Sequence, residues 1–570
     1  RTSVLTRDTD PPAHRLALAL WLRLLGPGAL QLRLLSALAG LGTVALVFLW
    51  AQDLGGSGAG VLSALLAALA PMLVYYSREA KAYPFVAFFA LVALYLWPRI
   101  LHAQGYRRWL LWLLYVLAQA LALGAHYYAL LFMAAQGVWL AAGLLRARAR
   151  RPQLRVLGLW LLAQGATALL VLPWVAQALP STLAGARDVS GHAALSLPAY
   201  LGAVLRELAA GPGAPLVPAL VALVVLLVGA GLGALHRRGA GAGLLGSAVL
   251  VSLLAGFVAQ RFVSFFFPRF LLYALPPLCL LCGLGLAGLR RTGYLLVAVL
   301  VAAWVSVLPN ALHLHVPPEE DLRPVAAALR SQAAAGDGVV VTYVWQEGIL
   351  RLLAPEAPVS YYLGWFEDDT VAAEMAALYA RYRRLWLVTY DVPLQHPQNT
   401  GGWWLEQHTA RILAVEAGRN RAVLYSAPPA GPPADGEVAV FADAIRLGGV
   451  LPDRVAPGEA LLVSLSWQVQ QPAGDPTVFV HLYDAAGSLS AQADGPPANG
   501  LRPLSSIALG ETVSDCRALI VPAAAVPGRY TLVVGLYDPS TGQRLMVTQG
   551  ADAGKDGARL GSVTVIAPAP

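Results

Sequence analysis

Charged residues are scarce in this sequence, and their scarcity excludes an ordinary soluble protein. Asp, Glu, Lys and Arg make up 13% of the 570 residues, whereas about a quarter of an average soluble chain is charged. Hydrophobic residues make up 57%, and the mean hydropathy is +0.60. The composition therefore predicts a membrane protein.

Cysteine is almost absent, and two common site motifs are missing. The chain has three cysteines, of which Cys279 and Cys282 fall in an apolar stretch, so a disulfide scaffold is excluded. No His, Cys or Asp residues have the spacing of a zinc site, and no glycine-rich nucleotide loop is present. The missing loop disfavours an enzyme that binds a nucleotide-sugar on a Rossmann scaffold.

Acidic residues are scarce only in the first half of the chain. Residues 1–309 contain 23 Lys and Arg but six Asp and Glu, whereas residues 310–570 contain 17 and 26. The first half is therefore basic and the second half acidic, which indicates two different kinds of domain. The arginines of the first half separate apolar stretches and form no basic stripe, which argues against nucleic-acid binding.

The apolar stretches have the length of membrane-spanning helices. A helix needs about 20 residues to cross about 30 Å of hydrocarbon. We predict ten spans, near residues 32–50, 60–76, 84–98, 110–125, 127–145, 156–174, 214–235, 242–259, 270–289 and 292–309.

Arginine is concentrated in every second connection between these spans. The arginine-rich connections contain residues 99–108, 146–155, 237–238 and 290–291. The positive-inside bias places these connections in the cytoplasm, so the alternate connections and everything after residue 310 lie outside. Residues 1–30 already fall on the outer side and the sequence starts at Arg1, so we expect an earlier span and an amino-terminally truncated chain.

The second half has the pattern of two smaller domains. Helix-like and strand-like segments alternate over residues 317–427, as in RPVAAALRSQ, GVVVTYV and LWLVTY. A Pro-rich link follows, and strand patterns such as ALLVSLSWQV and TVFVHLYD then alternate with turn residues. We therefore predict an α-helical polytopic membrane domain (1–309), a small extracytoplasmic α/β domain (310–427) and a C-terminal β-sandwich (437–570).

Polar residues gather in the segments assigned to the outer face. Asp188 and Glu207 lie in a long outer connection, where we expect them to be solvated. His126, taken alone, is typical of a packed or anchoring residue. The remaining candidates are Asp8 and Asp10 before a Pro-Pro step, Arg78, Glu79, Lys81 and Tyr83 in VYYSREAKAYPF, His126 in GAHYYALL, and Arg269 in FFFPRFLLYALPP.

This set of residue types fits the transfer of a group from a phosphate to a hydroxyl. A carboxylate is able to act as a general base, and cations neutralise the charge on a departing phosphate. Charged groups near the bilayer core are rare, and their convergence on one face therefore points to function.

Four segments, in this order, resemble a known family. DTDPPAHRLALALWLRLLG and the span after it resemble the D-x-H-P-P-L-Y-Y region of polytopic glycosyltransferases of the protein mannosyltransferase type (glycosyltransferase family 39-like), which have the GT-C fold and include the lipid A aminoarabinose transferases. PMLVYYSREAKAYPF is similar to Y-S-Q-E-A-R-M-Y, with Glu79 on the Glu, Lys81 on the Arg and Tyr83 on the last Tyr. AHYYALL is similar to T-H-Y-Y, and FFPRFLLYALPP to R-Y-L-L-P-x-x-P, with Arg269 on the Arg. The resemblance covers about residues 5–310.

The resemblance implies an activity and roles for these residues. Such enzymes transfer a sugar from a polyprenyl-phosphate donor to a lipid, glycan or protein acceptor on the outer face of the membrane. It implies that Lys81 and Arg269 contact the lipid phosphate and that Tyr83 and His126 line the cavity, with Arg78 beside them. Asp10 replaces the motif's His, and the family's principal catalytic acidic residue lies upstream of these motifs and is absent from this sequence. Asp8, Asp10 and Glu79 are therefore expected as accessory acidic residues.

Several alternatives stay open at this point. A polytopic transporter or a flippase of lipid-linked sugars also has many spans, although paired broken helices in two related halves are not evident. A lipid-linked oligosaccharide donor is not excluded. The Asp8–Asp10 pair is able to hold a divalent metal ion, which some GT-C enzymes need, but the sequence does not decide it. The resemblance implies a bacterial inner (plasma) membrane.

Overall fold

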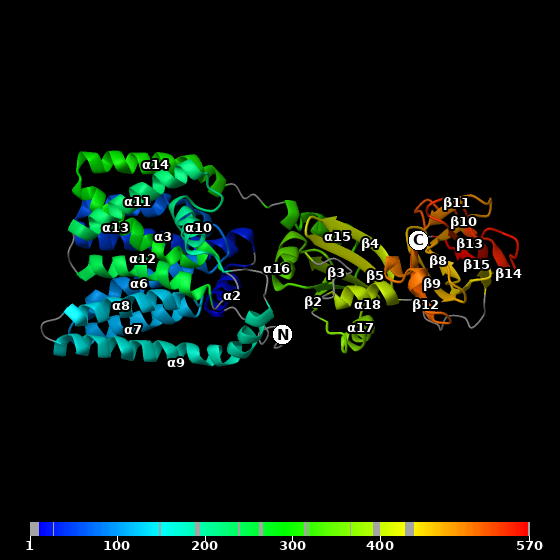
Figure 1. Ribbon diagram of the computed structural model, residues 1–570, viewed down its shortest axis with the longest axis horizontal. Coiled ribbons are helices and arrows are strands. Elements are labelled where there is room, and N and C mark those ends of the chain that lie inside the picture. The colour runs from blue at the N-terminus through cyan, green and yellow to red at the C-terminus, as the bar shows by residue number, and fades with distance from the viewer. Residues whose placement is uncertain are drawn as a thin grey trace. The chain divides into compact units, whose positions relative to one another are not determined.

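The computed structural model describes residues 11–26, 28–146, 150–188, 194–236, 240–261, 266–312, 316, 318–364, 366–391, 399–427 and 438–567. The chain forms two compact units, Arg1–His315 and Val316–Pro570. The first unit is helical, and the second is built around β-sheets (Figure 1).

Helices make up the first unit. Their bounds are α2 Ala13–Leu25, α3 Ala29–Gly55, α4 Ser57–Leu69, α5 Pro71–Ser77, α6 Tyr83–His102, α7 Gly105–Leu123, α8 Ala129–Arg146, α9 Arg150–Asp188, α10 Leu197–Ala210, α11 Leu216–His236, α12 Ala240–Ala259, the 3₁₀ helix η1 Pro268–Ala274, α13 Leu275–Gly288 and α14 Arg291–Leu312. The short α2 is amphipathic.

Within the described residues, eight segments are long and apolar enough to cross a membrane, and the bent pair α4–α5 makes a ninth if it counts as one span. The polytopic helical fold is thus confirmed, although we had predicted ten spans. The tenth predicted span corresponds to α7, which has Arg107 and Arg108 in its first turn and is not among the segments counted, so its crossing of the membrane stays a prediction.

The predicted span 60–76 is not one straight helix. It consists of α4 and α5, which meet at Ala70 with a bend of 59°. Ala70 has φ −58° and ψ 114°, outside the helical region. The residue before a proline is disfavoured in the helical region, so Pro71 ends α4 and starts α5.

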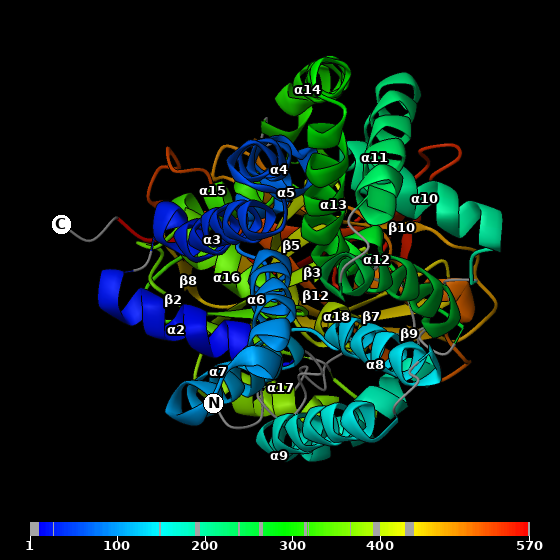
Figure 2. The ribbon, with the colours of Figure 1, turned by 90° about the vertical axis from the view of Figure 1, so that its left-hand side faces the viewer.

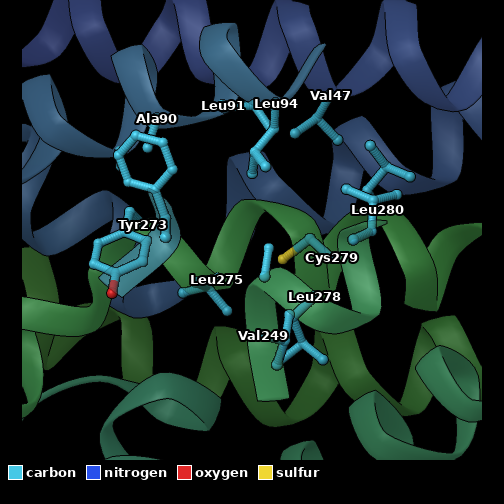
Figure 3. Close-up of a cluster of buried hydrophobic side chains, with 14 of the residues drawn as sticks. Val47, Ala90, Leu91, Leu94, Val249, Tyr273, Leu275, Leu278, Cys279 and Leu280 are labelled. Atoms are coloured by element: carbon cyan, nitrogen blue, oxygen red, sulfur yellow. The ribbon is translucent and has the colours of Figure 1, made fainter. Parts of the chain in front are cut away.

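Helix α13 lies at the centre of the first unit. In the segment Pro268–Gly288, 94% of the span is buried, and α13 packs against α3, α4, α11, α12 and α14 (Figure 2). A Cβ atom on Gly285 would lie 2.0 Å from the carbonyl oxygen of Gly229 on α11. Only glycine allows the two backbones to approach so closely. Figure 3 shows Val47 of α3, Leu94 of α6 and Cys279 of α13 in the surrounding apolar core.

The second unit begins with a five-stranded sheet in the order β2-β1-β3-β5-β4. Strand β1 pairs in parallel with β2 and β3, whereas β5 pairs antiparallel with β3 and β4. The elements are η2 Pro318–Glu320, α15 Arg323–Gln332, β1 Asp337–Val341, α16 Val344–Leu353, β2 Val359–Leu363, α17 Val371–Tyr379, β3 Arg384–Tyr390, α18 Thr400–His408, β4 Ala410–Ala417 and β5 Asn420–Ser426.

Helices cover both faces of this sheet. Leu329 of α15 and Leu350 of α16 share an apolar cluster on one face. Met375 of α17 and Leu405 of α18 belong to a separate cluster on the other face. The helices that follow β1 and β3 therefore lie on opposite faces of the sheet, α16 on one and α18 on the other.

Two five-stranded sheets follow, in the orders β11-β10-β13-β15-β8 and β12-β9-β7-β6-β14. Every second residue of β9 is buried, ending with Trp467 and Val469, as the alternating sequence predicts. The strands are β6 Ala439–Phe441, β7 Ile445–Val450, β8 Arg454–Val455, β9 Ala460–Val469, β10 Thr477–Tyr483, β11 Leu489–Gln492, β12 Thr512–Ile520, β13 Gly528–Tyr537, β14 Val547–Gly550 and β15 Ala558–Val565, with 3₁₀ helices η3 Pro497–Gly500 and η4 Leu504–Ser506.

The α/β sheet and these two sheets are joined by a buried carboxylate. Glu406 of α18 has a fully buried side chain and accepts hydrogen bonds from the Tyr425 hydroxyl at 2.7 Å and from Asn499 of η3. The two parts form one compact unit. The division of residues 310–427 from 437–570 into separate domains stays a prediction.

Candidate functional site

Arg269 lies where the chain enters the buried helix α13. It follows Pro268, the first residue of η1. Proline suits the first position of a helix because an N–H group there would have no partner within the helix, and proline has none. The guanidinium carbon of Arg269 lies 4.0 Å from the ring centroid of Phe267 and 5.8 Å from that of Tyr83. Its Nε is buried without a hydrogen-bond partner among the described residues. A guanidinium with an unused donor is suited to binding an anion.

Two tyrosines from neighbouring helices lie beside Arg269. Tyr76 is near the end of α5 and Tyr83 begins α6, and their ring centroids are 5.3 Å apart in an edge-on arrangement. The Arg269 side chain interacts with both hydroxyls. The short turn over residues 78–82 brings these two rings together, so the sequence YYSREAKAY places one tyrosine on each side of it.

Glu207 adds a carboxylate from α10. It is half-buried, and it interacts electrostatically with Arg269, Arg206 and Tyr76. Burial raises the pKa of Glu207, and the two arginines partly oppose that rise. Our expectation of a solvated loop residue was wrong, because residues 197–210 form a helix whose buried side includes Val204 and Leu208. The amphipathic spacing of these residues was the available signal.

His126 lies in the turn between α7 and α8. Its ring centroid is 4.6 Å from that of Phe270 and 5.7 Å from that of Tyr83. The Tyr128 N–H donates to Nδ1 at 3.2 Å, so the proton of the neutral ring is on Nε2. Burial, aided by the charge of Arg269, lowers the pKa of His126 to about 4. His126 is therefore a neutral ring near neutral pH, able to donate from Nε2.

Arg78 has a different environment from Arg269. Its guanidinium donates to the carbonyls of Ala311 at 2.9 Å and Leu312 at 2.5 Å. These carbonyls end α14 and have no partner within that helix. The structure thus uses Arg78 as a helix cap, whereas we had expected it to bind substrate. Arg78 and α14 are far apart in the sequence, so the sequence alone did not predict this contact.

The other predicted residues are placed as follows. Glu79 is half-buried, and it interacts electrostatically with Tyr76. Lys81 has an exposed side chain, and its carbonyl accepts a hydrogen bond from the Ser36 hydroxyl at 3.2 Å. Asp8 and Asp10 lie outside the described residues.

The start of α2 is attached to the turn that carries His126. The Ala13 N–H donates to the Gly124 carbonyl at 2.7 Å, and Pro11 is buried. Beside this contact lies a hollow of about 190 Å³ between α2, α7 and α9, with Leu117 and Trp174 in its apolar lining. The lining of the hollow does not include Arg269, so the hollow is not the polar site itself.

No group of three or more His, Cys, Asp or Glu able to hold a metal ion occurs among the described residues. The Asp8–Asp10 pair falls outside those residues. A metal ion near the donor phosphate therefore stays an expectation from the sequence.

Comparison with known proteins gives the context of this cluster. Residues 26–184 match the family described as dolichyl-phosphate-mannose-protein mannosyltransferase. No curated protein matches the sequence significantly. The chain is similar to the structure of ArnT from Cupriavidus metallidurans in the apo state, with 15% identity and a TM-score of 0.50 over 73% of this chain and 87% of that chain.

Two further structures are similar. ArnT from Cupriavidus metallidurans bound to undecaprenyl phosphate has 15% identity and a TM-score of 0.50 over 74% of this chain and 89% of that chain. The Archaeoglobus fulgidus oligosaccharyltransferase tethered with an acceptor peptide has 10% identity and a TM-score of 0.48 over 98% of this chain and 91% of that chain. The resemblance expected from the four motifs is thus confirmed, and the chain has the fold of the GT-C membrane glycosyltransferases.

Proposed function

We propose that the protein is a membrane glycosyltransferase that moves a sugar from a polyprenyl-phosphate donor to a lipid, glycan or protein acceptor on the outer face of the membrane. The observation that carries this proposal is the convergence of Arg269, Tyr76, Tyr83, Glu207 and His126 from five separate elements. A phosphate ester has the charge and the oxygen atoms that such a cluster binds.

In this reaction an acceptor hydroxyl forms a bond to the anomeric carbon of the donor sugar. The bond from that carbon to the phosphate oxygen breaks, and the polyprenyl phosphate leaves with the bonding electrons. The hydroxyl proton passes to a carboxylate. Arg269 and Lys81 neutralise the charge that develops on the phosphate.

The neighbouring residues have supporting roles in this proposal. Asp8, Asp10 and Glu79 supply accessory carboxylates. Tyr83 and His126 line the cavity, and His126 donates a hydrogen bond from Nε2 without adding a charge. The hydroxyls of Tyr76 and Tyr83 hold the Arg269 side chain in place.

Two comparisons support a lipid-linked donor. The matching family is described by a dolichyl-phosphate-mannose substrate, and one ArnT structure of the same fold contains undecaprenyl phosphate. We further propose a multi-pass location in a bacterial inner membrane, with residues after 310 on the extracytoplasmic side, because arginine is concentrated in the alternate connections.

A transfer assay in membranes tests the proposal. Membranes containing the protein are supplied with radiolabelled polyprenyl-phosphate sugars, and label in acceptor is counted for the wild type, Glu79→Gln and Arg269→Ala. We expect transfer by the wild type and its loss in both variants at unchanged protein levels. If no transfer occurs but labelled donor moves between the leaflets of reconstituted vesicles, the protein is a flippase and the proposal is wrong.

A further inference from the structure

The carboxyl ends of β1 and β3 lie side by side in the second unit. These parallel strands are adjacent, with Val341 opposite Val388. The chain leaves β1 toward α16 on one face of the sheet and resumes after β3 with α18 on the other. Open α/β sheets bind ligands at such a point, where neighbouring connections diverge.

Three aromatic side chains gather at these strand ends. Tyr343 follows β1 and lies opposite Tyr390, the last residue of β3, with ring centroids 6.0 Å apart. Trp345 stacks on Tyr343 at 5.9 Å and meets Tyr390 edge-on at 5.2 Å. Trp345 nevertheless remains 40% exposed. A large ring held by two neighbours but open to solvent is suited to stacking on a ligand.

A buried amide at the same place has an unused donor. Gln346 is fully buried, and its Oε1 accepts from the Tyr343 N–H at 3.0 Å and from the Thr342 hydroxyl at 3.2 Å. Because a backbone N–H only donates, this contact fixes the amide oxygen toward it. The Nε2 group has no hydrogen-bond partner among the described residues. A buried donor without a partner is costly, and a ligand oxygen would satisfy it.

Two charged side chains, Asp391 and Arg419, lie beside Tyr390. Asp391 follows Tyr390 with a positive φ of 54°, and its N–H donates to the Arg419 carbonyl at 2.8 Å. The side chains of Asp391 and Arg419 lie 3.9 Å apart, and both are more than half exposed. These strand ends thus offer an aromatic face, a buried donor, and exposed charged groups that accept and donate.

We propose that the side chains at these strand ends form a second, non-catalytic binding site for a saccharide unit. A sugar ring has an apolar C–H face for Trp345 and hydroxyls that accept from Gln346 and Arg419 and donate to Asp391. A lipid chain has no group for the buried Gln346 donor, although Ile349 and Leu352 of α16 are also exposed. The site consists of residues of the second unit, and the proposal does not depend on the proposed reaction.

Binding of methyl glycosides to the full chain in lipid nanodiscs tests this site. The probes are methyl α-mannopyranoside, methyl β-glucopyranoside and methyl β-galactopyranoside, followed by saturation-transfer NMR. We expect saturable binding of at least one probe, weakened about tenfold by Trp345→Ala and also reduced by Gln346→Glu, which removes the amide donor. Leu352→Ser is a matched control, because Leu352 has the same 40% exposure on the same helix, and it should bind as the wild type does.

The outcomes that overturn the proposal are distinct. Absence of binding for all three probes, or unchanged binding in Trp345→Ala, removes the site. Stronger quenching by brominated lipids in the wild type than in Trp345→Ala would show that Trp345 faces lipid instead. Arg269→Ala should bind the probe normally, so failure of the transferase proposal and failure of this one are distinguishable.

Discussion

The guanidinium of Arg269 lies 5.8 Å from the ring centroid of Tyr83, although the two residues belong to helical segments far apart in the sequence, η1 and α6. The contact holds a cation against an aromatic face while one guanidinium nitrogen stays unpartnered among the described residues. We therefore expect Arg269→Lys to lose the planar, multi-donor contact with phosphate and to raise the KM for donor about tenfold or more. Arg261→Ala is the control, because Arg261 is an exposed arginine that precedes the same segment, and its donor KM should stay unchanged.

Glu207→Gln should change both activity and the pH dependence of stability. The folded protein holds the Glu207 pKa above its ordinary value, mainly through burial. The folded state therefore binds a proton more tightly than the unfolded state, and the resulting stability is lost as the pH rises from about 4.3 to the raised pKa. The melting temperature of the wild type relative to Glu207→Gln should fall through that window. A constant difference across the window would contradict the assignment.

The buried neutral ring of His126 predicts the opposite pH dependence. Its pKa is lowered to about 4, against about 6.5 for an unperturbed histidine. The stability it contributes is present above about 6.5 and is lost as the pH falls toward about 4. His126→Phe keeps an aromatic ring and should weaken this acid-induced fall in melting temperature. An identical acid profile in the variant would show that His126 does not titrate as proposed.

Arg78→Ala separates a structural arginine from a substrate-binding one. The variant leaves the Ala311 and Leu312 carbonyls without their cap, and hydrogen bonds to a charged group contribute about 1.5–3 kcal/mol. We expect a lower melting temperature in detergent but an unchanged KM for donor. A raised donor KM at unchanged stability would restore Arg78 to the binding site.

Gly285→Ala should destabilise the helix pair α11–α13. The added Cβ would lie 2.0 Å from the Gly229 carbonyl oxygen, which is backbone and cannot rotate away. Overpacking of this kind costs about 1–3 kcal/mol. Gly288→Ala, at the end of the same helix with nothing within 4 Å of the new Cβ, is the matched control. Equal melting temperatures for both variants would contradict the close approach.

Much of the fold was predictable because its signals are local. The length of the apolar stretches predicted the membrane spans, and the alternation of apolar and polar residues in ALLVSLSWQV predicted strand β9. Pro71 could have predicted the bend at Ala70, because a residue before proline is disfavoured in the helical region. Arg107 and Arg108 make α7 less apolar, so the crossing predicted near residues 110–125 rests on the alternation of the arginine-rich connections and stays a prediction.

The candidate site was predictable only where a motif marked it. Tyr83, His126 and Arg269 were named from the sequence, and the structure brings them together. Glu207 and the capping role of Arg78 were missed because both depend on contacts between segments far apart in the chain. Spacing within one segment contains no information about such contacts.

The buried Glu406 determines how the second unit can be divided. Its carboxylate accepts from Tyr425 on the α/β sheet and from Asn499 beyond the Pro-rich link. Removal of residues 438–567 would take away the Asn499 donor and the strands β9 and β12, which pack on β4 and α18, and would expose apolar surface to water. Residues 316–427 produced alone should therefore fold poorly, whereas 316–570 should melt in a single cooperative transition and is the shortest piece suited to isolated crystallisation.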